Sequence, residues 1–235
     1  GKSKDEIEKI KKIDERIKNN LKENIKISDT DILCLSCYEP LINFSWSNKI
    51  KFSDKLKEIF ELHLNQNKIE NQISRTIKSL SKVEDQVSIN VKKQYEENPY
   101  PRWVNLGLSI EPRNIKDVIN DSDLNLDSKK ITNSENPEIL IAGCGTGQHA
   151  ITTASKYKKS KILALDLSFK SLSYAKRKAN ELGINNIDFI QGDILDLESI
   201  DRKFDIIETV GVLHHMDNPF KGWKILTSCL NNDSL

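Results

Sequence analysis

The spacing of apolar residues predicts helices in the first part of the chain. One stripe recurs every three or four positions, the period of a helix face, and consists of Ile7, Ile10, Ile13, Ile17 and Leu21. A second apolar helical stretch covers 29–44, with a break at Pro40, and a third covers 53–65. Shorter helical runs follow at about 69–80 and 84–95.

The pattern changes after Pro137, where short apolar runs begin to alternate with helical ones. Strands are predicted at 138–142, 161–166, 187–191 and 204–210, and helices at 147–157, 168–182 and about 219–230. Strands that alternate with helices favour parallel pairing. The pattern therefore predicts a doubly wound α/β sheet.

A segment of broken pattern separates these two parts. Residues 94–107 (QYEENPYPRWVNLG) are too rich in proline and aromatic residues for a helix, and 111–136 are polar, with a short helix near 114–120. We therefore expect a helical region over 1–95, a Pro/aromatic segment with a polar linker over 96–136, and an α/β domain over 137–235.

A glycine-rich turn follows the first predicted strand. Gly143, Gly145 and Gly147 lie between the strand and a helix, where bare backbone lets a ligand approach the helix N-terminus. The dinucleotide pattern G-x-G-x-x-G would need its third glycine at Gln148. The spacing instead suits a ligand without a pyrophosphate, whose amino-acid carboxylate meets the loop amides. A tight turn with no ligand is the alternative.

Two acidic residues follow the next two strands. Asp166 ends the second strand, where a carboxylate accepts hydrogen bonds from both ribose hydroxyls of NAD or of an adenosyl ligand. Asp193 follows the third strand, where it would accept from an adenine amino group. A surface loop acid is the alternative for Asp166, and a helix N-cap is the alternative for Asp193.

Charge and cysteine content narrow the class of protein. Lys and Arg number 36 against 35 Asp and Glu, so the net charge of +1 gives no overall attraction to nucleic acid or an anionic membrane. The net charge does not exclude a local basic patch. No apolar run approaches the ~20 residues of a membrane span, and no signal-peptide pattern opens the sequence. The four cysteines do not form a disulfide framework, so we expect a cytoplasmic protein with reduced thiols.

No metal site is expected. His149, His214 and His215 lack the neighbouring carboxylates or thiolates of a zinc or magnesium site. Cys34 and Cys37 form a lone C-x-x-C pair in an apolar helical pattern, which favours core packing.

Four segments together carry a family resemblance. ILIAGCGTGQHAI, ILALDLSFKSLSYAKRKA, FIQGDILDL and FDIIETVGVLHHMDNPFKGWKIL resemble, in order and spacing, the first four strands of a class I S-adenosylmethionine-dependent methyltransferase. VKKQYEENPYPRW is similar to a segment of bacterial methyltransferase domains often fused to tetratricopeptide repeats. The resemblance implies a Rossmann-like core with strand order 3-2-1-4-5-7-6. Because only four strands are predicted, we expect a fragment with an incomplete substrate pocket.

The resemblance also implies roles for individual residues. The cofactor S-adenosyl-L-methionine would contact Gly143, Cys144, Gly145, Gly147, Asp166, Leu167, Asp193, Ile194, Thr209 and Val210. His214 is the candidate general base, and the acceptor would contact Tyr95, Tyr100, Arg102 and His215. Trp103 is expected to anchor the segment, and Cys144 to act as a small filler without chemistry. Gln148 and His149 either reach the ligand or only pack in the first turn of the helix.

The implied function is methyl transfer (EC 2.1.1.-) by in-line attack on the sulfonium methyl, with a small-molecule acceptor and no nucleic-acid or membrane partner. One alternative is a non-catalytic adapter that binds the cofactor and recruits protein partners through upstream helical repeats. An NAD-dependent oxidoreductase is a second alternative, which Gln148 disfavours. A nucleic-acid methyltransferase is disfavoured because GVLHH replaces the N/D-P-P-Y/F segment of amino-directed DNA enzymes.

Overall fold

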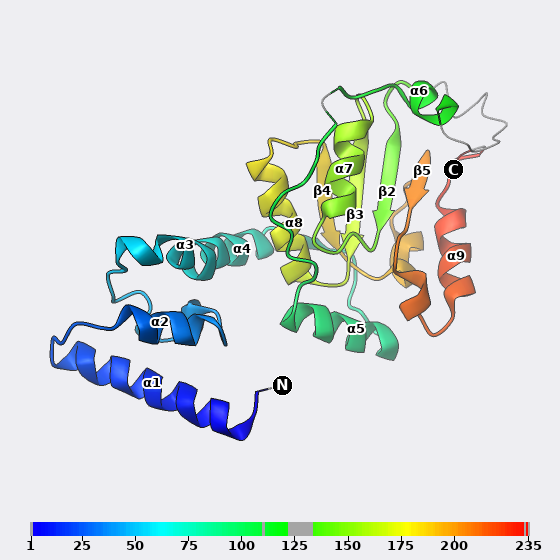
Figure 1. Cartoon of the computed structure of the whole chain (residues 1–235). Helices are drawn as coiled ribbons and strands as arrows, with labels where there is room; N and C mark the ends of the chain where they lie inside the picture. Colours follow the sequence, from blue (N-terminus) through cyan, green and yellow to red (C-terminus); the bar gives the residue numbers. More distant parts are fainter. Residues whose placement is uncertain (1, 110, 122–133, 233, 235) are drawn as a thin grey trace. The chain divides into compact units, whose positions relative to one another are not determined.

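A computed structural model of the chain describes residues 2–109, 111–121, 134–232 and 234 (Figure 1). These residues pack as two compact units, Gly1–Glu70 and Asn71–Leu235. The expected boundary near residue 95 differs from this division. Residues 71–95 belong to the second unit, to which they contribute a strand and most of a helix. Positions 122–133 of the expected polar linker lie outside the described residues.

The first unit is helical. Its elements are α1 (Lys4–Lys22), α2 (Asp29–Ser36), η1 (Leu41–Asn43), η2 (Asp54–Leu56), α3 (Lys57–Phe60), η3 (Glu61–Asn65) and the start of α4 (Gln66–Ser74). The predicted helix at 29–44 ends at Ser36, and a short 3-10 turn follows Pro40, because proline cannot continue the helical hydrogen bonding. Ile17, Leu35 and Trp46 are buried in the core of this unit.

The second unit contains the predicted parallel sheet. Its strands are β1 (Lys78–Ser79), β2 (Glu138–Ala142), β3 (Lys161–Asp166), β4 (Ile187–Gln191) and β5 (Ile206–Glu208), in the order β1-β4-β3-β2-β5. The helical elements are α5 (Gln86–Glu97), α6 (Ile115–Asn120), α7 (Gln148–Lys156), α8 (Phe169–Glu181), η5 (Ile194–Ser199), η6 (Leu213–His215) and α9 (Pro219–Ser228). The four predicted strands keep the order third, second, first, fourth, which confirms the Rossmann-like α/β fold.

The strand β1 was not predicted. Lys78 lies opposite Ile190 and Ser79 opposite Gln191, and the Ser79 hydroxyl donates to Gln191 Oε1 at 2.6 Å. Both residues of β1 are exposed, so no apolar pattern marks the strand in the sequence. Within the described residues, β5 forms the opposite end of the sheet and has β2 as its single neighbour, as expected for a strand with an uncovered edge.

Both faces of the central strands are buried, which explains their continuous apolar runs. On β2, Ile139 and Ile141 pack into a cluster with residues of α6 and α7. Leu140 and Ala142 pack into a second cluster with residues of η5 and α9. Such two-sided burial is typical of parallel strands between helical layers. The carboxyl ends of β2, β3 and β4 therefore meet at one edge of the sheet, where open α/β sheets bind ligands. No helix in the described part of the chain is both long and apolar enough to cross a lipid bilayer.

Candidate functional site

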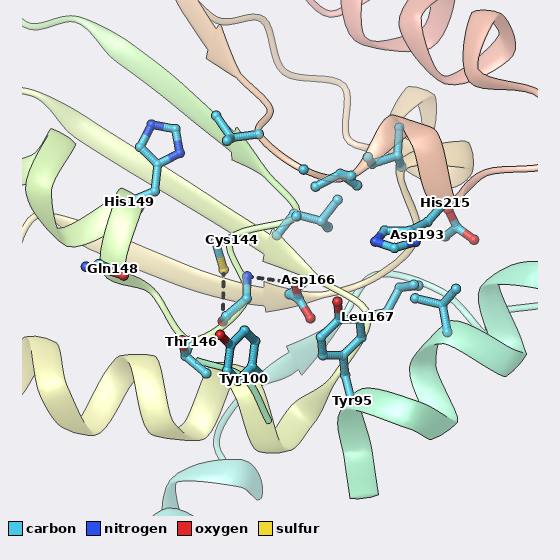
Figure 2. A pocket seen from close by; sticks show the side chains of 18 of the residues that line it. Tyr95, Tyr100, Cys144, Thr146, Gln148, His149, Asp166, Leu167, Asp193 and His215 are labelled. Carbon is cyan, nitrogen blue, oxygen red and sulfur yellow. Dashed lines mark hydrogen bonds between the residues drawn. The ribbon is translucent and has the colours of Figure 1, made fainter. Parts of the chain in front are cut away.

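A cavity of about 630 Å³ lies at the carboxyl ends of the strands (Figure 2). The turn after β2, the ends of β3 and β4 and the segment after β5 line it on the sheet side, and α5 and the Tyr100–Pro101 segment line it on the other. Eleven of the predicted site residues are among its lining residues: Tyr95, Tyr100, Gly143, Cys144, Gly145, Asp166, Leu167, Asp193, Ile194, Val210 and His215.

The three glycines of the turn differ in what they provide. Gly143, Gly145 and Gly147 all have positive φ angles (77°, 53° and 84°), a conformation that favours glycine. A Cβ on Gly143 would lie 2.3 Å from Val212, and one on Gly147 would lie 2.5 Å from the Cβ of Ala175. A Cβ on Gly145 would meet nothing closer than 4.0 Å. Gly143 and Gly147 are thus needed for packing, while Gly145 borders open space in the cavity.

Asp166 holds this turn in place. Its Oδ2 accepts a hydrogen bond from the Gly145 amide at 2.8 Å, and its Oδ1 accepts one from the Ser168 amide at 2.9 Å. Burial raises the pKa of Asp166 above its ordinary value, although these backbone hydrogen bonds act in the opposite direction. The Leu167 amide also acts on this carboxylate, which has about four acceptor positions and so retains capacity for a ligand hydroxyl.

Asp193 is the N-cap of η5, which was the structural alternative for this residue. Its Oδ1 accepts from the Leu195 amide at 3.0 Å. Within the described part of the chain, no protein donor reaches its Oδ2. Asp193 is 4% exposed and lines the cavity beside Leu167 and Ile194.

The Pro/aromatic segment anchors the glycine turn. The Trp103 indole donates to the Thr146 carbonyl at 3.0 Å, and the Thr146 hydroxyl donates to the Pro101 carbonyl at 2.6 Å. The Tyr174 hydroxyl of α8 donates to the Trp103 carbonyl, and the two rings pack edge to face at 6.0 Å. Trp103 is therefore structural, as expected. Arg102 does not line the cavity, because its guanidinium lies over the Tyr174 ring at 4.5 Å.

One face of α5 closes the other side of the cavity. Ser88, Val91 and Tyr95 line it, at the spacing of successive turns of a helix. Figure 2 shows Tyr95 and Tyr100 projecting into the space that Asp166 also borders. Aromatic walls here can pack on apolar or cationic groups.

The segment after β5 places the two adjacent histidines differently. His215 lines the cavity and His214 does not, although their ring centroids are only 4.1 Å apart. The two rings pack against each other at the turn η6, and only the His215 ring borders the cavity. Thr209 also lies outside the cavity lining, whereas Val210 lines it. The Thr209 hydroxyl is buried and has no hydrogen-bond partner among the described residues.

A histidine–glutamate pair was missed by sequence reasoning. His149 Nε2 lies 2.8 Å from Glu208 Oε2, and the Thr153 hydroxyl donates to the same oxygen at 2.7 Å. Burial acts to raise the pKa of Glu208, but the hydrogen bonds from His149 and Thr153 outweigh it and the pKa is lowered. His149 lines the cavity and Glu208 stands behind it. No signal in the sequence connects α7 to β5 at these positions.

The cysteines differ in their exposure. The described residues contain no group of three or more His, Cys, Asp or Glu side chains that could hold a metal ion. Cys37 is exposed and Cys34 partly buried, so core packing does not describe Cys37. Cys144 is buried, and burial raises the pKa of its thiol well above the ordinary value, which keeps it protonated and unreactive.

Comparison with known proteins gives matches over the part of the chain that contains the sheet side of this site. Residues 139–232 match the family described as methyltransferase domain. A probable (S)-tetrahydroprotoberberine N-methyltransferase 2 of Papaver bracteatum is 35% identical over 97 residues, which cover 41% of this chain and 27% of that protein. The release factor glutamine methyltransferase of Flavobacterium psychrophilum is 38% identical over 80 residues, covering 33% and 27%.

Solved structures include a similar protein with a bound ligand. PKMT2 from Rickettsia typhi in complex with AdoHcy is 31% identical, with a TM-score of 0.39, over 42% of this chain and 19% of that chain. The chain spans about a quarter of the length of the first curated relatives that it matches.

Proposed function

We propose that this chain, whose residues 139–232 form a class I S-adenosylmethionine-dependent methyltransferase domain, catalyses methyl transfer to a small-molecule acceptor. The observation that carries the proposal is the cavity of about 630 Å³, in which the glycine turn, Asp166 and Asp193 follow one another along one edge of the sheet. That order matches the order of the amino-acid part, sugar and base in the cofactor of this domain class.

The cofactor would lie along this edge. The adenine ring would pack between Leu167 and Ile194, and its amino group would donate to Asp193 Oδ2. The ribose hydroxyls would donate to the remaining lone pairs of Asp166. The amino-acid part would follow the open backbone at Gly145, where no side chain intervenes. The position of each of these residues in the cavity lining supports this arrangement.

The chemistry of transfer would come from the cofactor, whose sulfonium donates a methyl group to an attacking lone pair and becomes a thioether. The protein would align the acceptor with the methyl group and exclude water. An acceptor atom that carries a hydrogen, such as a hydroxyl oxygen or a secondary amine nitrogen, would release that proton on methylation, whereas a tertiary amine would release none. His215, which lines the cavity, is better placed than His214 to accept that proton.

The small-molecule acceptor is supported by the covered shape of the cavity. α5 and the Tyr100–Pro101 segment enclose the side opposite the sheet, and Tyr95 and Met216 contribute apolar surface. Enclosed, largely apolar sites suit small ligands. The Papaver bracteatum relative is named as a probable (S)-tetrahydroprotoberberine N-methyltransferase, which is consistent with this class of acceptor.

Calorimetry with S-adenosylhomocysteine tests the cofactor assignment. We expect the chain to bind this product with a dissociation constant in the micromolar range. NAD should bind at least about tenfold more weakly, because the third glycine of the dinucleotide motif would have to stand at Gln148 and stands instead at Gly147. Binding of NAD without binding of S-adenosylhomocysteine would assign the site to an oxidoreductase instead. Transfer of a labelled methyl group to amine-containing small molecules would then test the acceptor class.

A further inference from the structure

The His149–Glu208 pair is an ionisable pair at the cavity for which the cofactor arrangement above gives no role. His149 lies in the first turn of α7, and Glu208 is the last residue of β5. Their side chains meet at 2.8 Å, and Thr153 adds a second hydrogen bond to the same carboxylate oxygen. The histidine reaches the cavity surface while the carboxylate supports it from behind.

The pair lies at a defined end of the cavity. Figure 2 shows His149 and Asp193 at opposite ends, with Cys144, Thr146 and Asp166 between them. If the adenine of the cofactor lies at Asp193 and its ribose lies at Asp166, the amino-acid part extends past Gly145 toward His149. This end is where a carboxylate and an ammonium group of the ligand would need partners.

The hydrogen bonds of the pair determine which imidazole nitrogen meets a ligand. The pKa of Glu208 is lowered, so its carboxylate is ionised at neutral pH and accepts the proton of His149 Nε2. His149 Nδ1 has no partner within the described residues. The other groups that face Glu208 are Lys156, whose charge also lowers the pKa of Glu208, and Tyr157, whose own pKa is raised to about 12 and which therefore stays neutral.

We propose that His149, oriented by Glu208, is a positioning residue that binds the carboxylate of the amino-acid part of the cofactor through Nδ1. With Nε2–H directed at Glu208, the opposite edge of the imidazole ring is left to face the ligand carboxylate, so the ring would lie between a carboxylate of the protein and one of the ligand. Charge-assisted hydrogen bonds of this kind are shorter and stronger than neutral ones. The inference rests on the proposed function, because it needs the cofactor in this cavity.

The inference separates two ligands that share a nucleoside. S-adenosylhomocysteine carries the amino-acid part, and 5′-methylthioadenosine lacks it. Replacing a residue that binds the carboxylate should weaken the binding of S-adenosylhomocysteine alone. A residue that only supports the fold of the turn affects both, since both use Asp166 and Asp193.

The experiment is calorimetry of both ligands with the unmodified chain and three variants. We expect His149→Phe, which keeps a ring but removes both nitrogens, to weaken S-adenosylhomocysteine binding about tenfold or more, the scale of a hydrogen bond to a charged group. Glu208→Gln should weaken it by a smaller factor because the histidine loses its ionised partner. Both variants should leave 5′-methylthioadenosine binding unchanged. His214→Gln is the matched control, since His214 does not line the cavity, and should change neither affinity.

An equal loss for both ligands, or no loss in either variant, would overturn the inference. Circular dichroism and thermal unfolding identify a variant that fails to fold, and His149→Gln, which keeps a donor for Glu208, then replaces His149→Phe. If the unmodified chain binds neither ligand, the proposed function falls. If it binds both and the variants behave like it, the proposed function stands and this inference alone fails.

Discussion

The carboxylate of Asp166 accepts a hydrogen bond from the backbone amide of Gly145 at 2.8 Å, so the acid at the end of β3 fixes the bare turn after β2. The same side chain caps the Ser168 amide at the start of α8. One residue therefore joins the end of β3, the turn after β2 and the start of α8 before any ligand is bound. A ligand that enters meets a turn already in shape, which lowers the entropy cost of binding.

Replacing Asp166 tests this arrangement. Asp166→Ala removes the acceptor for Gly145 and the proposed partner of the ribose hydroxyls. We expect it to weaken binding of S-adenosylhomocysteine by at least about 1 kcal/mol, the scale of a lost hydrogen bond to a charged group. Calorimetry measures the change. An unchanged affinity in a folded variant would remove Asp166 from the site.

The raised pKa of Asp166 predicts a dependence of stability on pH. Its folded-state pKa lies above the ordinary value of 3.8, so the folded chain binds this proton more tightly than the unfolded chain. As pH rises from 3.8 through the raised pKa, the unfolded state ionises first, and the free energy of unfolding should fall. Above that window this contribution stays lost.

Urea unfolding at several values of pH, compared with Asp166→Asn, isolates this contribution. The unmodified chain should lose stability relative to the variant as pH rises through the window. Glu208 acts with the opposite sign, because its lowered pKa stabilises the fold above its ordinary value of 4.5 and the contribution is lost as pH falls. If the free energy of unfolding of the unmodified chain, minus that of Asp166→Asn, rises with pH through this window, the pKa of Asp166 is not raised.

The glycines of the turn should respond differently to alanine. Gly147→Ala forces a methyl group to within 2.5 Å of Ala175 at a φ of +84°, so we expect it to destabilise the unit by at least about 2 kcal/mol. Gly145→Ala meets open space and should cost about 1 kcal/mol for its backbone conformation alone.

Ligand affinity separates these two glycines further. The methyl group of Gly145→Ala would occupy the space of the bound ligand, so this variant should stay folded and lose S-adenosylhomocysteine binding. Denaturant unfolding and calorimetry measure both properties. Retained affinity in Gly145→Ala would mean that the ligand does not approach this backbone.

The indole of Trp103 should stabilise the turn from the opposite side. Trp103→Phe leaves the Thr146 carbonyl without its donor, which is expected to cost roughly 1–3 kcal/mol and to weaken cofactor binding. Trp46→Phe is a matched control, because Trp46 also donates its indole proton, to Asp14 at 2.7 Å in the first unit. The control should destabilise the first unit and leave the affinity for S-adenosylhomocysteine unchanged.

Much of the second unit could be predicted from single segments of sequence. The strands at Ile139–Ile141 and Ile162–Leu165 were found because burial on both faces leaves a continuous apolar run. The turn was found because three positive φ angles in five residues leave a glycine pattern. Each signal is local, since it depends on the environment of consecutive residues.

Other features left no such signal. β1 is short and exposed, so its place beside β4 depends on hydrogen bonds to Gln191 rather than on burial. Arg102 was expected at the cavity, but its guanidinium lies over the Tyr174 ring and it is not among the lining residues. His214 and His215 are equivalent in the sequence, and only the 3-10 turn decides which of them reaches the cavity.

Apolar periodicity and glycine spacing were enough to predict the α/β class and the carboxyl-end edge where a ligand would bind, because both are properties of neighbouring residues. The order of the central strands was implied by the family resemblance. The tertiary structure alone decided that His149 meets Glu208 and that Asp166 holds Gly145. Those contacts join residues far apart in the chain, and their geometry depends on how the helices pack against the sheet.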